Sequence, residues 1–235
     1  PEILERLQHN RIAPHLAITV PGEAERSEAQ RILSRYSAGS WKVIVVPNRG
    51  RDIGPFITAL GDELFNGYDI VGHLHTKKSK DIKDETFGRI WYRFLLDNLV
   101  GNESTPMADI IVGQMAAQDS LGMVFPDDPY ISGWERNREF ARELVLKSGW
   151  GTTAEKEAFI AKFTEHFAYP IGTMFWARAE SLRPLLELGL TWEDYPPEPL
   201  PYDGSMLHAL ERLVPLFVQW GGRAVALSWL PGTTR

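Results

Sequence analysis

The feature that most constrains this chain is an alternation of strand-like and helix-like segments along its first half. Runs rich in β-branched residues occur at 15–20 (HLAITV), 41–46 (WKVIVV) and 68–74 (YDIVGHL). Between them, residues 23–36 and 53–66 have the spacing of amphipathic helices. Because parallel strands are joined through crossover helices, the alternation predicts an α/β fold with a mixed, mostly parallel sheet flanked by helices.

The second half continues with both kinds of segment. Strands are expected at 121–125 and 171–177. Helices are expected at 86–100, 105–118, 134–148, 180–188 and 204–220, with a Pro-rich loop at 191–203 and no firm expectation for 151–168. Without an internal repeat or a low-complexity linker, we expect one domain over residues 1–235.

Charge and cysteine content exclude several classes of function. The 25 Lys and Arg residues against 31 Asp and Glu residues leave a net charge of −6, which argues against a nucleic acid polymer as partner. The absence of cysteine excludes disulfides, thiolate metal sites and thiol nucleophiles. No apolar run approaches the roughly 20 residues of a transmembrane segment. An anionic ligand would therefore need a local basic patch.

The first candidate site is the polar turn 48–52 (NRGRD), between a strand end and a helix start. Open α/β sheets bind ligands at such positions, and helix N-termini favour anions. Asn48, Arg51 and Asp52 are the candidate ligand-binding residues. In the alternative interpretation, this is a plain turn in which Asp52 caps the following helix.

The second candidate is the cationic stretch 73–79 (HLHTKKS) at the end of the third expected strand. His73 and His75 alternate onto one face of that strand, and Lys77 and Lys78 follow. A His-x-His pair also begins some metal sites, but further ligands at a recognisable spacing are missing. We favour an anion-binding site over a solvated basic loop, because the cluster stands where the fold expects a ligand.

Two further segments suggest catalytic and stacking residues. Asp203 opens the last helix and is a candidate general base, with Glu193, Asp194 and Glu198 as rivals. The alternative makes Asp203 an N-cap. Glu211 and Arg212 are expected on the solvent face of that helix. In the segment 172–178 (GTMFWAR), Phe175 is expected in the core, whereas Trp176 has the aromatic face that stacks on sugar rings.

Taken together, four segments resemble one protein family, the rhamnan synthesis protein F family. They are VVPNRGRDIGPF, HLHTKKS, IGTMFWAR and DGSMLHALERL, in this order. The resemblance extends from about Ala17 to about Gly222. It implies a GT-A-like, Rossmann-like glycosyltransferase fold, with a nucleotide-sugar-binding half at about 15–125 and an acceptor-binding half at about 126–235.

The resemblance also implies roles for individual residues. Many enzymes of that fold carry Asp-x-Asp, which holds a divalent metal, where this chain has His73-Leu74-His75. Mg²⁺ or Mn²⁺ dependence is thus in doubt, and the basic residues are expected to stabilise the leaving diphosphate instead. The acidic position that carries the general base falls at Asp203. The candidates for donor binding are Asn48, Arg51, Asp52, His73, His75, Lys77 and Lys78, and those for acceptor binding are Trp176 and Glu198.

The resulting hypothesis is an inverting glycosyltransferase. It would move rhamnose or another hexose from a nucleoside diphosphate, with dTDP-rhamnose as the first candidate donor, to a cell-surface polysaccharide or lipid-linked glycan. We expect it in the cytoplasm, with a peripheral position at the inner face of the plasma membrane as one option. The alternative is a non-catalytic carbohydrate- or nucleotide-sugar-binding domain of a larger synthase. A metallohydrolase built on His73 and His75 ranks third.

Overall fold

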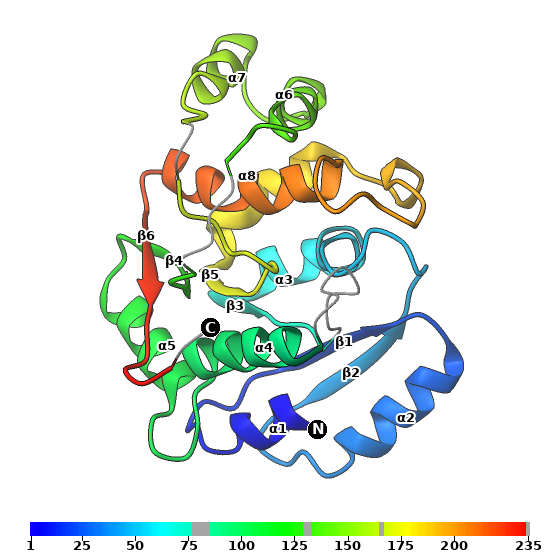
Figure 1. Cartoon of the computed structure of the whole chain (residues 1–235), viewed down its shortest axis with the longest axis vertical. Coiled ribbons are helices and arrows are strands. Elements are labelled where there is room, and N and C mark those ends of the chain that lie inside the picture. The colour runs from blue at the N-terminus through cyan, green and yellow to red at the C-terminus, as the bar shows by residue number, and fades with distance from the viewer. Residues whose placement is uncertain (77–84, 129–132, 165–166, 234–235) are drawn as a thin grey trace. The chain divides into compact units, whose positions relative to one another are not determined.

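The chain divides into two compact units that are interleaved along the sequence. The computed structural model describes residues 1–76, 85–128, 133–164 and 167–233 (Figure 1). Unit 1 comprises residues 1–48, 76–114 and 229–235, and unit 2 comprises residues 49–75 and 115–228. The expected class, α/β, is confirmed, and the expectation of one domain with halves at 15–125 and 126–235 stays a prediction.

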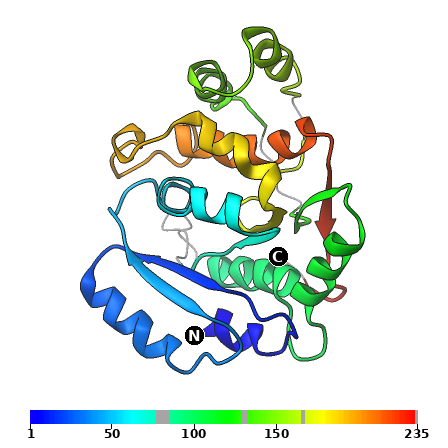
Figure 2. The same cartoon turned by 180° about the vertical axis from the view of Figure 1, so that it is seen from behind.

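Unit 1 is built on two parallel strands, β1 (Leu16–Val20) and β2 (Trp41–Val45), which pair from Leu16 opposite Trp41 onward. Helix α2 (Glu23–Leu33) is the crossover between them and packs on both, as Figure 2 shows from behind. The helices α1 (Glu2–Leu7) and α4 (Glu85–Leu99) and most of α5 (Met107–Ala117) complete the unit. The first strand-helix-strand prediction is therefore confirmed.

Unit 2 contains a four-stranded sheet in the order β3-β5-β4-β6. Its strands are β3 (Ile70–His73), β4 (Leu121–Pro126), β5 (Phe175–Arg178) and β6 (Ala224–Ser228). Strand β5 runs antiparallel to both β3 and β4, whereas β4 and β6 are parallel. Two of the three pairings described in this sheet are antiparallel, so the prediction of a mostly parallel sheet is wrong for this unit. Apolar runs show that a strand is buried but carry no information on the direction of its neighbours.

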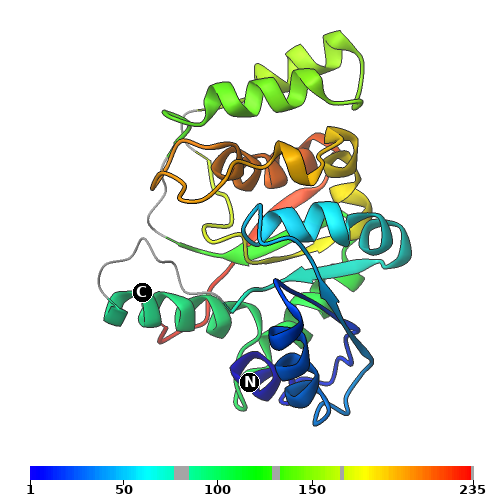
Figure 3. The same cartoon turned by 90° about the vertical axis from the view of Figure 1, so that its right-hand side faces the viewer.

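Helices cover this sheet in layers. Figure 3 shows α3 (Gly61–Gly67), the 3₁₀ segment η2 (Ala179–Leu188) and α8 (Met206–Trp220) above the sheet, with α6 (Arg138–Lys147) and α7 (Thr153–Ile160) beyond them. A short 3₁₀ turn, η3 (Trp192–Asp194), lies in the Pro-rich loop. The apolar face expected on α8 comprises Met206, Leu210, Leu213, Val214 and Phe217; all are buried except Met206, which is partly buried, and Leu207 is buried as well. No helix in the described part of the chain is long and apolar enough to cross a membrane.

The segment after the turn 48–52 departs from the expected single helix. It consists of a π-helical turn, η1 (Pro55–Ala59), followed by α3. Its predicted apolar face is confirmed, since Ile53, Phe56 and Ile57 are buried. The helical backbone begins at Ile53, directly after Asp52, and Gly54, the residue before η1, makes no side-chain capping bond. π-helical turns often occur at functional sites because the extra residue redirects the backbone.

Candidate active site

The turn after β2 is fixed by backbone geometry and by two arginines. Gly50 (φ +75°) and Arg51 (φ +51°) both adopt the left-handed conformation. Arg49 donates from Nε to the Tyr195 carbonyl at 2.7 Å, and Arg51 donates from Nε to Glu198 Oε1 at 3.2 Å. Two side chains of the turn therefore hold it against the loop before α8. Arg51, expected to bind the donor sugar nucleotide, and Glu198, expected to bind the acceptor glycan, form an ion pair.

Gly50 is required here for space as well as conformation. A Cβ at Gly50 would lie 2.8 Å from the Cα of Gly54 and 3.0 Å from the Tyr195 ring. The ring is held in place because Tyr195 Oη and Thr58 Oγ1 are hydrogen-bonded at 2.7 Å. The close approach of turn, helix start and Tyr195 thus depends on the missing side chain.

Replacing Gly50 by alanine is expected to lower the free energy of unfolding by about 2 to 3 kcal/mol, through the left-handed backbone and the overlap with Gly54. Thermal unfolding measures the loss. Gly113→Ala is the matched control: it lies in α5 with open space around its Cα, and should raise stability by about 0.5 to 1 kcal/mol. Equal stability of Gly50→Ala and the parent chain would contradict the role of this turn.

The two histidines of the HLH motif are held by one turn of the chain. His73 Nδ1 lies 2.5 Å from the carbonyl oxygen of Thr173, and His75 Nε2 lies 2.6 Å from that of Gly172. A carbonyl oxygen accepts only, so both ring nitrogens carry the proton. Gly172 (φ +81°) and Thr173 (φ +57°) are in the left-handed conformation, which turns both carbonyls toward the histidines. In an L-residue such as Thr173 this conformation is strained and recurs at functional sites.

The two rings have different surroundings. His73 is 8% exposed and packs between Phe56 and Phe175, and this burial lowers the pKa of its imidazole. His75 is partly exposed, but its Nδ1 atom is buried and has no hydrogen-bond partner. His73 therefore supports the site from within, whereas His75 offers a nitrogen lone pair.

Glu211 faces the same turn from α8, contrary to the expectation that it points to solvent. Its Oε1 accepts the Gly172 N–H at 2.7 Å, and its side chain is 13% exposed. Burial raises the pKa of Glu211 to about 7, against the opposing effect of Arg212, and the negative charge of Asp52 adds to the rise. The prediction was wrong because Glu211 lies one turn beyond Leu207, on the buried edge of the helix.

This raised pKa predicts a pH dependence of stability. The ordinary pKa is 4.5, so between pH 4.5 and 7 the folded chain holds a proton on Glu211 that the unfolded chain has released. Stability should therefore fall across this interval, on the order of 3 kcal/mol from this group. The fall should be absent from Glu211→Gln and retained in Glu157→Gln, whose side chain is exposed on α7. Denaturant unfolding of the three chains at pH 5 and pH 8 measures it, and parallel pH profiles would contradict it.

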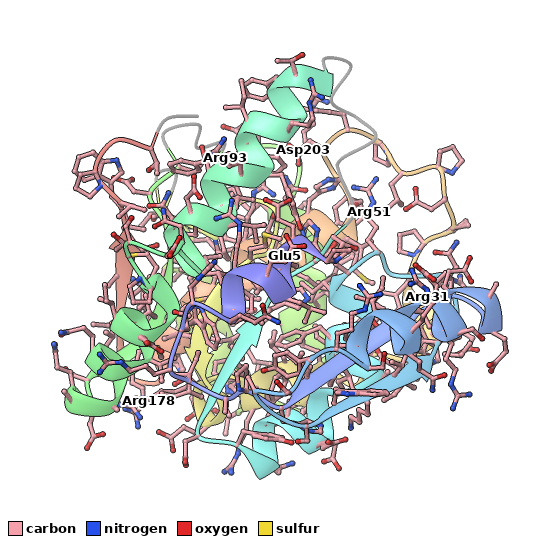
Figure 4. The ribbon with its side chains drawn as sticks, turned by 90° about the horizontal axis from the view of Figure 1, so that it is seen from below. Glu5, Arg31, Arg51, Arg93, Arg178 and Asp203 are labelled. Atoms are coloured by element: carbon pink, nitrogen blue, oxygen red, sulfur yellow. The ribbon has the colours of Figure 1, made fainter. Side chains whose placement is uncertain are left out.

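Asp203 is held by side chains rather than serving as a helix cap. Its Oδ1 accepts from Asn137 Nδ2 at 2.8 Å and lies 3.5 Å from Arg212 Nη2 (Figure 4 labels Asp203). The N-cap of α8 is Ser205, so the alternative interpretation of Asp203 is wrong. Partial burial favours the neutral acid, but the Asn137 bond and the charge of Arg212 outweigh it and lower the pKa of Asp203. The carboxylate is ionised at neutral pH.

Arg212 joins Asp203 to Glu211 and is itself buried, again contrary to expectation. It is 2% exposed and donates to the carbonyls of Gly133 and His208, both at 2.9 Å. Its Nη1 lies 3.8 Å from Glu211 Oε2, and its guanidinium stacks on the Tyr169 ring. A single cation thus lies between the two carboxylates of the site.

The remaining candidates are spread over several places. Asn48 is exposed at the end of β2, in unit 1. Trp176 is 6% exposed with its ring packed over Gly72, which leaves little ring surface for stacking, while Phe175 is fully buried as expected. Among the rivals for the base, Asp194 accepts from Thr191 in a local capping box. Lys77 and Lys78 lie outside the described residues.

The described residues do not form a metal site. Within 1–76, 85–128, 133–164 and 167–233, no group of three or more His, Asp or Glu side chains is placed to hold an ion. The histidines at the Asp-x-Asp position each use one nitrogen on a carbonyl oxygen. Such a bond leaves the second ring nitrogen available, as in metal-bound histidines, so Mg²⁺ or Mn²⁺ dependence stays a prediction.

Comparisons with known proteins point to one family. The family model described as "Rhamnan synthesis protein F" matches residues 1–222. Two relatives, each named "Uncharacterized protein WxcX", come from Xanthomonas campestris pv. campestris strains B100 and ATCC 33913. Each is 32% identical over 181 residues, which is 76% of this chain. The aligned region spans about a quarter, 24%, of the length of those relatives. No solved structure matches.

Proposed function

We propose that this chain, which belongs to the rhamnan synthesis protein F family, is an inverting glycosyltransferase of polysaccharide synthesis. Its donor would be a nucleoside diphosphate sugar, with dTDP-rhamnose the first candidate because the family is one of rhamnan synthesis. Its acceptor would be a hydroxyl of a polysaccharide or lipid-linked glycan, met at the cytoplasmic face of the membrane. A GT-A-like arrangement of the sheet is part of the same proposal.

The observation that carries the proposal is the ionised, oriented carboxylate of Asp203. Asn137 and Arg212 fix Oδ1, which orients the carboxylate, and the lowered pKa keeps it ready to accept a proton. Such a group suits a displacement in which the leaving group departs easily and the attacking hydroxyl loses its proton late, because a weak base is then sufficient.

The proposed reaction has one displacement step. The oxygen of the acceptor hydroxyl forms a bond to the anomeric carbon while the bond from that carbon to the diphosphate oxygen breaks. Asp203 takes the hydroxyl proton, and the nucleoside diphosphate leaves with the bonding electron pair. Attack from the face opposite the diphosphate inverts the anomeric centre. This proposal routes no step through a metal.

In unit 2, the donor would lie along residues 49–52 and the end of β3. There Arg51 would pair with phosphate, and Asp52 and His75 would contact the remaining polar groups of the nucleotide sugar. The roles expected of Asn48 in donor binding and of Lys77 and Lys78 in neutralising the diphosphate fall on residues of unit 1 and stay predictions from the sequence. His73 acts by holding the Gly172–Thr173 turn in place. Glu198, paired with Arg51, would lie on the acceptor side.

The direct test is incubation of the purified chain with labelled nucleotide sugars and a lipid-linked glycan acceptor. The panel contains dTDP-rhamnose, UDP-glucose and GDP-mannose, and the readout is label in the glycan together with the anomeric configuration of the new bond by NMR. Transfer with inversion supports the proposal. Transfer with retention, or hydrolysis of the donor alone, contradicts it.

The second candidate is a non-catalytic nucleotide-sugar-binding domain of a larger synthase. It is favoured by one observation, that the region shared with the two relatives makes up about a quarter of their length. It predicts calorimetric binding of a nucleotide sugar without transfer, and unchanged affinity in Asp203→Asn.

A further inference from the structure

His75 and Glu211 both hydrogen-bond the backbone of Gly172, and Asp52 acts on Glu211 through its charge. Asp52 Oδ2 and His75 Nδ1 are buried side-chain atoms that have no hydrogen-bond partner. Glu211 receives the backbone N–H of Gly172 on Oε1, while Thr173 Oγ1 is 3.5 Å from the same oxygen. A buried acceptor without a donor is unfavourable, and water or a ligand can supply the missing donor at such an atom.

Contacts through Phe56 connect Asp52 to this turn. The Phe56 N–H donates to the Asp52 carbonyl at 3.3 Å, and the Phe56 ring centroid lies 4.4 Å from that of His73, which is hydrogen-bonded to Thr173. The charge of Asp52 also raises the pKa of Glu211. Asp52 comes from the turn before η1, His75 from the end of β3, and Glu211 from α8. All three residues are partly exposed, so the cluster reaches the surface of unit 2 while the acceptor atoms lie beneath it.

The backbone fixes the chemical character of this cluster. Because His75 Nε2 donates to the Gly172 carbonyl, its Nδ1 in the neutral ring presents a lone pair. Thr173 is held in a strained conformation that makes this arrangement possible. Asp52 Oδ2 and His75 Nδ1 are therefore acceptors without a donor, and a phosphate oxygen, which is also an acceptor, is disfavoured beside them.

We propose that Asp52, His75 and Glu211 form a pocket for the hydroxyl groups of a glycosyl ring, the hydroxyl pocket. Hydroxyls are the ligands that suit it, because each O–H donates one hydrogen bond and adjacent ring hydroxyls serve neighbouring acceptors. The proposal rests on the proposed function and specifies it: these residues recognise the sugar of the donor, and the diphosphate is bound elsewhere.

Calorimetry with matched ligands distinguishes binding of the sugar from binding of the nucleoside diphosphate. The probes are dTDP-rhamnose and UDP-glucose, each compared with dTDP and UDP. Asp52→Asn and Glu211→Gln keep the shape of each side chain but replace one acceptor oxygen by an N–H₂ donor. We expect affinity for the nucleotide sugar to fall about ten- to a hundredfold in each variant, and affinity for the nucleoside diphosphate to change less than about twofold.

A control variant and the contrary outcomes distinguish failure of the hydroxyl pocket from failure of the proposed function. Glu187→Gln, an exposed carboxylate on η2, should leave both affinities unchanged. Equal losses for nucleotide sugar and nucleoside diphosphate would overturn the hydroxyl pocket, as would unchanged affinities. If the parent chain binds no nucleotide sugar, the proposed function fails first. The same variants are then tested by ligand-observed NMR with methyl rhamnoside and methyl glucoside. Binding that is lost in Asp52→Asn and Glu211→Gln supports the pocket, and absence of binding by the parent chain overturns it.

Discussion

Replacing Asp203 by asparagine is expected to lower glycosyl transfer by about 10²- to 10⁴-fold, the range measured when a positioned general base is removed. The amide keeps the size of the carboxylate, and its oxygen still accepts from Asn137 and Arg212. It cannot take the proton of the acceptor hydroxyl. Turnover should therefore fall while the dissociation constant for the donor changes little, which initial rates and calorimetry on one preparation measure.

A matched variant distinguishes the loss of a general base from the loss of a negative charge. Asp62→Asn removes an exposed carboxylate on α3 of the same unit and should leave the rate within about twofold of the parent chain. Rates that do not differ between Asp203→Asn and Asp62→Asn would remove Asp203 from the role of base. In that case the carboxyl of Glu211, whose pKa is raised to about 7, becomes the next group to test.

Replacing Arg212 by methionine is expected to lower the free energy of unfolding by about 3 to 5 kcal/mol, the typical cost of removing one partner of a buried ionic group. Methionine fills much of the volume but leaves Asp203 and Glu211 without the cation between them. The carbonyls of Gly133 and His208 lose their donor as well. Denaturant unfolding measures the loss, and transfer should fall together with stability.

Two further variants test the explanation. Arg142→Met removes an exposed arginine from α6 and should change stability by less than about 0.5 kcal/mol. Arg212→Lys keeps the charge but lacks the planar fork that reaches both carbonyls and both carboxylates, so it should recover only part of the stability. A lysine variant as stable as the parent chain would show that charge alone matters at this position.

The two largest effects differ in kind. Asp203→Asn should lose activity and keep the fold, whereas Arg212→Met should lose both, because Arg212 is a positioning residue that acts through Asp203 and Glu211. Unfolding measurements between pH 4.5 and 7 provide a third test, because protonation of Glu211 changes the number of negative charges facing Arg212.

The sequence was informative wherever local patterns decide the outcome. Strands β1 to β4 and helices α2, α4, α5, α6 and α8 fall where periodicity and β-branched runs predict them, within a few residues. The four motifs led to the family that the comparisons then showed. Strand β6 and helix α1 were not predicted, and the strand expected at 171–177 begins only at Phe175, because Gly172 and Thr173 turn the chain in the left-handed conformation.

Part of the candidate site could likewise be predicted from the sequence, and the rest depends on the tertiary structure. Motifs alone indicated Asp203, His75, Asp52 and Arg51 as candidate site residues, because residue type and position after a strand or before a helix can be read locally. Glu211 and Arg212 were assigned to solvent, and only the packing of α8 against the 172–173 turn places them inside. Other features depend on segments about 40 to 160 residues apart in the sequence. They are the direction of the strands, the carbonyls that fix the histidine protons, and the raised pKa of Glu211. Side-chain spacing along one helix or strand contains no information about such contacts. Only the tertiary structure therefore shows which polar residues lie together in the candidate site.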